Sequence, residues 1–369
     1  MAAGFEPPPY PYDRLEPMMA KAQEHDGGAV DLSVGTPNDP PPQFVIDALA
    51  QSGAERGYPA SIGSVALRNA ASEWMQRRLG VDVPSTAVAA CIGTKELVAC
   101  IPQYLKLRTP DRDTVLYPAI SYPTYEMGAI LAGCRAVPVP VDEHWRLDLG
   151  AISEDDAARA LVLWVNTPGN PAGQIDDLGA AAAWGRAHAV PVFSDECYVE
   201  FTWDGPRRTI LEHGTEGLVA VHSLSKRSNL AGVRVGFYAG DEGLVDYLRE
   251  VRKHAGFMVP GPVQAAAVVA LADDAHVDVQ AERYRERLER FAETLGTVGP
   301  KPDLPGGGFY LWAQAPDGDA WGHAERLAVD GGVLVTPGDT FGPQGAGHIR
   351  VALVQPLERL ELVARRLGR

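Results

Sequence analysis

The sequence predicts an α/β protein with a large domain built on a mainly parallel sheet and a smaller α+β domain. The chain has 369 residues, enough for about two domains, and 46 % of them are hydrophobic, so it can build a sizeable core. Short apolar runs alternate with helical stretches, which is typical of parallel strands covered on both faces. This pattern changes near Asp273, where a long amphipathic helix opens the second part of the chain.

The apolar runs are the expected strands of the large domain. They are Ala87–Ile92, Thr114–Tyr117, Ala136–Val139, Ala160–Val165, Val190–Phe193, Leu218–Val221 and Arg234–Ala239. Polar loop residues follow each run, and often a helical stretch comes next. We therefore expect a mainly parallel seven-stranded sheet flanked by helices.

The change of pattern divides the chain into three parts. Residues 1–45 are expected to form a proline-rich extended arm and part of the small domain, with a short helix after about residue 13 and another from Gln43. Residues 46–274 are expected to form the large domain. Residues 275–369 are expected to form the small C-terminal domain, with short strands split by glycine turns and a closing helix from Pro356.

Composition excludes several classes of partner. Acidic residues number 48 against 33 basic ones, and a net charge of −15 argues against nucleic acid and anionic membranes as partners. No run of about 18 apolar residues predicts a membrane span, and the N-terminus lacks an apolar signal-peptide core. The four cysteines form no CxxC pair and the nine histidines show no ligand spacing, so we expect a cytoplasmic protein with reduced thiols and no metal site.

The residues that follow the expected strands are the candidates for function, because ligands of open parallel sheets bind beyond the carboxyl ends of the strands. Gly93 and Thr94 open a helix whose free backbone N–H groups could hold an anion, although an ordinary helix cap explains them equally. Tyr122 precedes a proline, and its ring could cover a planar ligand or simply pack in a loop.

The next strand ends carry amide and acidic side chains. Asn166 and Asn170 lie in one loop rich in proline and glycine, where asparagine can also cap a helix. Asp195 directly follows an apolar run, and Tyr198 comes three residues later. A carboxylate in this position requires a compensating partner, either a ligand or a structural cation.

One of only six lysines, Lys226, follows the strand that ends at Val221. Ser223 and Ser225 precede it, and Arg234 comes eight residues later. A lone lysine is usually a solvated surface residue, but a lysine at the end of a buried strand is better explained as a nucleophile. Arg350 interrupts the apolar segment "HIRVALV" and is either an edge-strand surface residue or a clamp for a carboxylate.

Taken together, these side chains form the set that pyridoxal phosphate and an amino acid require. A lysine bonds covalently to the aldehyde, and an aspartate keeps the pyridine nitrogen protonated, which makes the ring an electron sink. Glycine, threonine, serine and arginine bind the phosphate, and a second arginine holds the substrate carboxylate.

Three motifs carry a resemblance to a known family. The segments "NTPGNPAG", "SDECY" and "SLSKRSNLAGVRVG" resemble those of the fold-type-I, class I/II pyridoxal-phosphate-dependent aminotransferases, and the likeness extends along nearly the whole chain. Ala172 stands where threonine is usual in that family, and Thr167 before Pro168 is a further departure. The resemblance implies a homodimer with shared active sites.

The resemblance also implies individual roles. Lys226 would be the catalytic lysine. The cofactor would contact Gly93, Thr94, Lys95, Tyr122, Asn170, Asp195, Tyr198, Ser223 and Arg234, with Tyr58 supplied by the partner subunit. The substrate would contact Gly35, Asn170 and Arg350.

A narrower likeness concerns the substrate. Segments such as "PPYPYDRLEP" and "VRKHAGFMVPGPVQAA" are similar to those of actinobacterial N-succinyldiaminopimelate aminotransferases of lysine and cell-wall precursor synthesis. This implies transfer between glutamate and N-succinyl-2-amino-6-oxopimelate, giving 2-oxoglutarate and N-succinyl-LL-2,6-diaminopimelate. Lys95, Arg227 and His254 are candidates for the distal groups of the succinylated substrate, although each has an equally good explanation as a solvated surface residue.

Two rival functions stay open. One is another fold-type-I enzyme, either an aminotransferase with a different amino-acid substrate or a carbon–sulfur lyase. The other is a regulatory module that binds the cofactor without catalysis. The second is disfavoured because only about 45 residues precede the main domain, without a helix-turn-helix pattern or a basic stretch.

Overall fold

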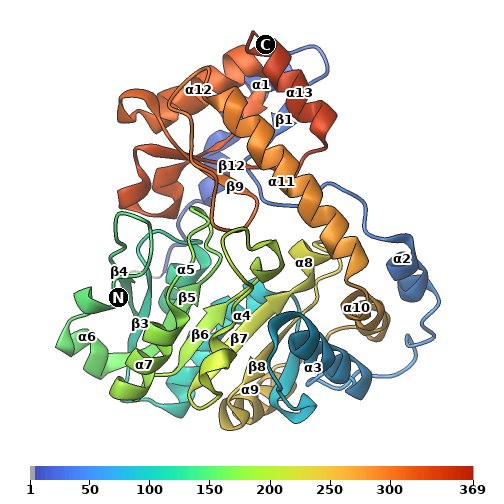
Figure 1. Ribbon diagram of the computed structural model, residues 1–369. Coiled ribbons are helices and arrows are strands. Elements are labelled where there is room, and N and C mark those ends of the chain that lie inside the picture. The colour runs from blue at the N-terminus through green and yellow to red at the C-terminus, as the bar shows by residue number, and fades with distance from the viewer. Residues whose placement is uncertain (1–4, 369) are drawn as a thin grey trace.

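The computed structural model describes residues 5–368. A large sheet domain lies below a smaller domain in Figure 1, and helix α11 (Ala275–Leu295) runs from one to the other. Met1–Gly4 of the expected N-terminal arm lie outside the described residues. The rest of the arm has no regular structure until a 3₁₀ helix at Pro11–Leu15. The predicted division of the chain into three parts stays a prediction.

The main sheet contains seven strands within residues 5–368, in the order β2-β8-β7-β6-β5-β3-β4. They are β2 (Val88–Cys91), β3 (Thr114–Pro118), β4 (Arg135–Val139), β5 (Ala160–Asn166), β6 (Val192–Asp195), β7 (Leu218–Ser223) and β8 (Gly236–Gly240). All neighbouring strands are parallel except β8, which is antiparallel to both β2 and β7. The fold-type-I α/β prediction is confirmed.

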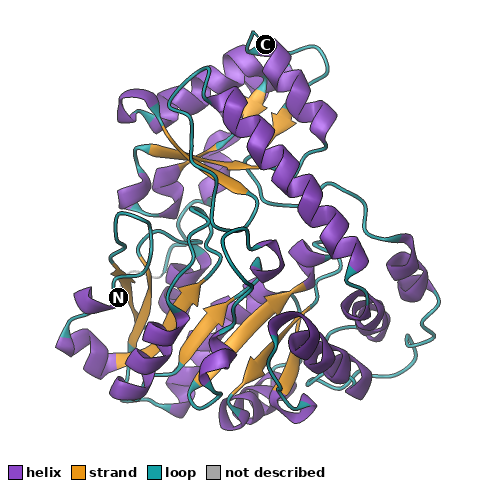
Figure 2. Cartoon of the chain, viewed as in Figure 1, coloured by secondary structure: helices purple, strands orange, loops and turns teal. Residues whose placement is uncertain are grey.

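Helices cover both faces of this sheet (Figure 2). The helices of the large domain are α2 (Gln43–Ala50), α3 (Val65–Leu79), α4 (Thr94–Arg108), α5 (Thr124–Leu131), α6 (Glu154–Arg159), α7 (Leu178–His188), α8 (Leu224–Arg227), α9 (Glu242–His254) and α10 (Gly261–Ala272). Side chains alternate along β5, so that Leu163 and Val165 pack into one core while Val162 and Trp164 pack into another. This explains why the strands read as unbroken apolar runs rather than as alternating ones.

One strand boundary differs from the expectation in a way that affects the site. The run Val190–Phe193 predicted that Asp195 lies in the loop after a strand. The strand instead begins at Val192 and continues through Asp195, because Asp195 pairs in register with Asn166 of β5 and Val221 of β7. Asp195 is therefore held by the sheet itself.

The smaller domain contains two small sheets in the described part of the chain. Strands β11 (Thr336–Pro337), β12 (His348–Ala352) and β9 (Tyr310–Gln314) form an antiparallel sheet with β12 in the middle, and β1 (Val30–Asp31) pairs in parallel with β10 (Val333–Leu334). Helices α1 (Glu16–Gln23), α11, α12 (Ala320–Gly331) and α13 (Leu357–Arg366) pack around them. Segments from both ends of the chain thus share one core.

Short 3₁₀ helices complete the structure. Besides the one in the N-terminal arm, they are Ser85–Ala87, Leu149–Ala151, Val199–Phe201, Ile210–His213, Pro316–Gly318, Gly338–Phe341 and Pro343–Gly345. No helix between residues 5 and 368 is long and apolar enough to cross a membrane.

The small-domain core predicts a stability effect. Leu288 of α11 is 2 % exposed, so Leu288→Ala should remove packing contacts, leave a cavity and lower the free energy of unfolding by about 2–5 kcal/mol. Val279 on the same helix is 53 % exposed, and Val279→Ala is the matched control with an expected effect below about 0.5 kcal/mol. Urea denaturation measures both. Equal losses in the two variants would contradict this account of the core.

Candidate active site

A cavity of about 390 Å³ lies at the carboxyl ends of β5, β6 and β7, and residues of both domains line it. Its size is typical of sites for small molecules and cofactors. Every predicted cofactor and substrate contact lines the cavity except Gly93 and Tyr58, leaving aside the candidates for the distal substrate groups. The chain therefore gathers strand-end side chains that are far apart in the sequence, as expected for an open parallel sheet.

Asp195 is a buried carboxylate that accepts hydrogen bonds from uncharged donors. Its Oδ2 accepts from the Tyr125 hydroxyl at 2.9 Å, and its Oδ1 accepts from the backbone N–H of Cys197 at 3.2 Å. Burial raises the pKa of Asp195, and these hydrogen bonds, together with the charge of Lys226, oppose that rise. A ligand that brings a positive charge to this carboxylate would be bound strongly.

Lys226 lies on the four-residue helix α8 directly after β7. Its amine donates a hydrogen bond to the backbone carbonyl of Gly35. Burial lowers the pKa of Lys226 to about 8, so the neutral, nucleophilic form is accessible near physiological pH. Residue 35 must be glycine here, because a Cβ would collide with the Tyr310 hydroxyl.

Thr94 and Arg234 line the cavity next to Gly93. Gly93 caps the 15-residue helix α4 with a φ of 72°, and a Cβ at this position would collide with the Arg234 guanidinium. Arg234 donates to the carbonyl of Ala231 at 2.9 Å and lies 3.5 Å from Ser225 Oγ. The N-terminus of α4 and a guanidinium thus lie side by side, which is an arrangement suited to a phosphate.

Arg350 is a buried cation on the middle strand of the small antiparallel sheet, 1 % exposed. Its Nη1 donates to Asn170 Oδ1 at 2.8 Å and its Nη2 to the Tyr12 hydroxyl at 3.1 Å. Its Nε has no hydrogen-bond partner among the described residues. The alternative of an edge-strand surface residue is therefore wrong, and the guanidinium is placed to bind a carboxylate.

The asparagine and tyrosine side chains have distinct surroundings. Asn166 Oδ1 accepts from the backbone N–H of Asn170 at 2.8 Å, while Asn166 Nδ2 donates to the carbonyl of Asp195 at 2.9 Å. Tyr198 is hydrogen-bonded to the Tyr310 hydroxyl at 2.9 Å. Asn166 thus stabilises the loop that contains Asn170, while the side chains of Asn170 and Tyr198 line the cavity.

Besides Gly93, three predicted contacts do not line the cavity, namely Tyr58 and two of the candidates for the distal substrate groups, Arg227 and His254. Tyr58 is 99 % exposed and does not line the cavity of its own chain. Arg227 is buried in a separate ion cluster and His254 is exposed at the end of α9. Neither Arg227 nor His254 lines the cavity, so the structure does not place them as contacts for distal substrate groups.

Sequence reasoning missed several residues that complete the site. Tyr125 contacts Asp195, Tyr310 contacts Tyr198, and Tyr12 contacts Arg350. Tyr125 lies only three residues after Tyr122, but the helical spacing gives no sign of a partner 70 residues later. The pairing of Tyr12 with Arg350 spans 338 residues and carries no local signal.

The residues present fit pyridoxal phosphate. The buried carboxylate of Asp195 suits a protonated ring nitrogen, and the amine of Lys226 suits the aldehyde. The α4 N-terminus, Ser223 and Arg234 would hold the phosphate, and Tyr122 would cover the ring. This fit rests on the charge and hydrogen-bonding capacity of the side chains that line the cavity.

Comparisons with known proteins agree with this chemistry. The model of the family described as "Aminotransferase class I and II" matches residues 28–367. The chain is 41 % identical to "4-dedimethylamino-4-oxo-anhydrotetracycline transaminase OxyQ" of Streptomyces rimosus, over 98 % of this chain and 99 % of that protein. It is 43 % identical to "Probable aminotransferase Rv1178" of Mycobacterium tuberculosis, over 98 % and 85 %.

Further relatives act on diaminopimelate compounds according to their names. An "LL-diaminopimelate aminotransferase" of Desulforudis audaxviator is 34 % identical over 98 % of this chain and 95 % of that protein. The solved structure of a "probable N-succinyldiaminopimelate aminotransferase" from Thermus thermophilus superposes with a TM-score of 0.86 at 33 % identity, covering 96 % and 98 % of the two chains. The relatives therefore share the amino-transfer chemistry but differ in the named substrate.

The low pKa of Lys226 predicts a pH-dependent stability of the cofactor-free protein. Because the folded-state pKa is about 8 and the ordinary value is 10.5, the unfolded chain binds more protons between these values, and stability should rise with pH across this interval. Below about pH 8 the buried charge destabilises the fold in full. Cofactor-free Lys226→Met should therefore be more stable than the wild type near pH 7, and the difference should shrink towards pH 10. Urea unfolding at several pH values measures it, and parallel pH profiles of the two proteins would contradict the prediction.

Proposed function

The chain belongs to the class I and II aminotransferase family, whose members depend on pyridoxal phosphate, and we propose that it transfers an amino group from glutamate to N-succinyl-2-amino-6-oxopimelate. The products are 2-oxoglutarate and N-succinyl-LL-2,6-diaminopimelate. The observation that carries the chemistry is one cavity that holds a low-pKa lysine, a buried carboxylate and a buried arginine with an unpartnered N–H. The Thermus thermophilus structure and the segment likeness support the substrate.

The side chains divide the reaction among them. Pyridoxal phosphate, when bound, supplies the electron sink that makes the substrate Cα proton acidic. Arg350 holds the α-carboxylate of either substrate, with Asn170 and Tyr12 fixing the plane of the guanidinium. Lys226, as a neutral amine, removes the proton from Cα and returns one in the second half of the cycle. Asp195 would hold a proton on the ring nitrogen, because its buried carboxylate is an acceptor that lines the cavity.

Lys95 is our candidate for the distal carboxylate of both substrates. It lines the cavity, and its Nζ lies 3.5 Å from the Tyr10 hydroxyl and 5.7 Å from the centre of the Tyr122 ring. Glutamate and the succinylated substrate each carry a second carboxylate. An ammonium group between two aromatic rings can attract the second carboxylate of a substrate over a range of distances, which suits substrates of different length.

We further propose that two subunits share each site and that the enzyme is cytoplasmic. Tyr58 is almost fully exposed, together with the nearby side chain of Val65, which is 63 % exposed. A second subunit that covered this surface would bury both side chains. The four cysteines are free thiols, as in a reducing compartment.

A second candidate acceptor follows from the relative named as a tetracycline-intermediate transaminase. It matches 98 % of this chain at 41 % identity, so a bulky cyclic ketone competes with the succinylated keto acid as the amino acceptor. The amino-donor half of the reaction is common to both candidates.

Half-reactions test the function directly. The purified, cofactor-loaded protein should react with glutamate, with a change in the absorbance of the bound cofactor, and the reaction should be reversed by N-succinyl-2-amino-6-oxopimelate. Lys226→Ala should lose both responses, because no amine remains to bond to the cofactor or move the proton. A carbon–sulfur lyase would instead release ammonia and a thiol from a cysteine-type substrate. Failure of glutamate to react in an intact, loaded protein would overturn the aminotransferase assignment.

Lys95→Gln tests the distal contact. The variant should raise KM for glutamate and for the succinylated substrate by about tenfold, the loss expected for one charge-assisted contact, with a smaller change in KM for alanine. Lys253→Gln, a change of an exposed lysine that does not line the cavity, is the control. If KM for alanine rises as much as KM for glutamate, Lys95 does not bind the distal carboxylate.

A further inference from the structure

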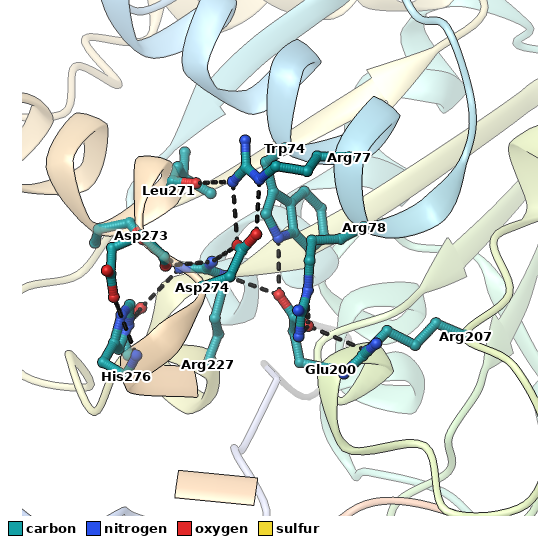
Figure 3. Close-up of polar contacts among 12 residues, drawn as sticks. Trp74, Arg77, Arg78, Glu200, Arg207, Arg227, Leu271, Asp273, Asp274 and His276 are labelled. Carbon is teal, nitrogen blue, oxygen red and sulfur yellow. Dashed lines mark hydrogen bonds and ion pairs between the residues drawn. The ribbon is translucent and has the colours of Figure 1, made fainter. Parts of the chain in front are cut away.

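A buried ion cluster lies beside the site, centred on Glu200 in the 3₁₀ turn Val199–Phe201 (Figure 3). Glu200 is 3 % exposed and accepts hydrogen bonds from Trp74 at 2.8 Å, Arg78 at 2.9 Å and Arg227 at 3.1 Å. Arg207 lies 3.2 Å away as a further ion-pair partner. A carboxylate shared by three arginines in the interior requires every donor to be accurately held.

Arg227 is the member of this Glu200 cluster that joins it to the active site, because it directly follows Lys226 in α8. Its side chain is 4 % exposed, and all five of its N–H groups have acceptors. Nε donates to Glu200, Nη1 to Ser228 Oγ and the carbonyl of Ala270, and Nη2 to the carbonyl of Asp273 and to Asp274 Oδ1. The guanidinium has no N–H left for a substrate, which explains why it is not a distal-carboxylate contact.

The acceptors of Arg227 lie where the chain passes from the large domain to the small one. Ala270 is in the last turn of α10, and Asp274 is the N-cap residue of α11, the helix that runs into the small domain (Figure 1). Arg77 of α3 also binds Asp274, through two hydrogen bonds of 2.6 and 3.1 Å. The α10–α11 turn is thus fixed to the large domain by two separate arginines.

Helix α8 needs such an anchor. It has only four residues, and a single helical turn has no stability of its own in water. The Lys226 side chain is directed into the cavity and donates only to the Gly35 carbonyl, so it does not hold the turn in place from that side. The adjacent side chain, Arg227, is directed into the cluster and ties α8 to two other segments, the 3₁₀ turn that contains Glu200 and the α10–α11 turn.

We propose that Arg227 is a positioning residue, which fixes α8 against the α10–α11 turn and thereby aims the Lys226 amine at the cofactor and the substrate Cα. The inference rests on the proposed function, in which Lys226 is the proton-transferring amine. The charge of Arg227 is neutralised by Glu200 and Asp274, so its effect on Lys226 is transmitted through the position of the backbone.

The test compares Arg227→Gln and Arg227→Lys with Arg77→Gln. Arg77→Gln removes a partner of the same Asp274 carboxylate and loosens the same turn, but it does not touch α8. Hydrogen exchange of the amides of residues 224–228 is measured in the cofactor-free proteins. The steady-state constants for glutamate are measured in the loaded proteins, well below the melting temperature of every variant.

In Arg227→Gln, exchange at residues 224–228 should be about tenfold faster or more, and kcat should fall by about 100-fold, a loss of the size that misplacement of a reacting group by about 1 Å produces. KM should change little, because Arg350 and Lys95 are untouched. Arg227→Lys keeps the charge beside Glu200 but offers three N–H donors in place of five. Compared with Arg227→Gln, it should therefore restore most of the lost thermal stability but little of the lost kcat. In Arg77→Gln, exchange at α8 and kcat should stay within about threefold of the wild type.

The outcomes separate this inference from the proposed function. If wild-type protein does not react with glutamate, the function is wrong. If the wild type reacts and Arg227→Lys has wild-type kcat, or Arg77→Gln loses as much kcat as Arg227→Gln, the positioning role is overturned while the function stands. Arg227→Lys and hydrogen exchange of the cofactor-free protein keep the test decisive if Arg227→Gln folds poorly.

Discussion

The site depends on a buried carboxylate, that of Asp195, whose hydrogen-bond donors in the described chain are uncharged. Asp195 lies at the end of a central strand, with its backbone fixed by β5 and β7 and its oxygens held by a hydroxyl and a backbone N–H. Such donors reduce the cost of burying the charge without cancelling it. In the proposed function, a protonated cofactor ring in the cavity would relieve the remaining cost, so the carboxylate that lowers the stability of the empty protein would contribute affinity for the cofactor. The neighbouring Lys226 follows the same logic, because burial keeps its amine ready to lose a proton.

The predictable part of this site consists of residues that a local sequence pattern marks. Lys226, Asp195 and Asn170 could be chosen because each follows a long apolar run, and the burial of that run is visible in the sequence alone. The seven strands of the described chain were found for the same reason, and boundary shifts such as the two residues at Val192 reflect strand pairing that no local pattern contains.

Strand direction, strand position in a sheet and side-chain partners far away in the sequence could not be predicted. The pattern of β8 is as apolar as that of β7, yet it runs antiparallel, and the apolar segment around Arg350 gave no sign that its strand lies in the middle of a sheet. Tyr12 and Tyr125 are defined by partners 338 and 70 residues away. For Arg227 the sequence offered a distal substrate contact or a surface residue, and neither is right, because its acceptors include Glu200 and the α10–α11 turn, which lie far from it in the sequence.

The pairing of β1 with β10 has a consequence for biosynthesis. Val30 and Asp31 are among the first residues of the described chain to leave the ribosome, and their partners Val333 and Leu334 emerge some 300 residues later. Strand β2 likewise waits for β8, which is translated almost 150 residues after it. Val30 and Asp31 therefore have no strand partner while the strands of the large domain are being translated. The core of the small domain, which joins segments from both ends of the described chain, can be completed only when translation of that chain is nearly finished.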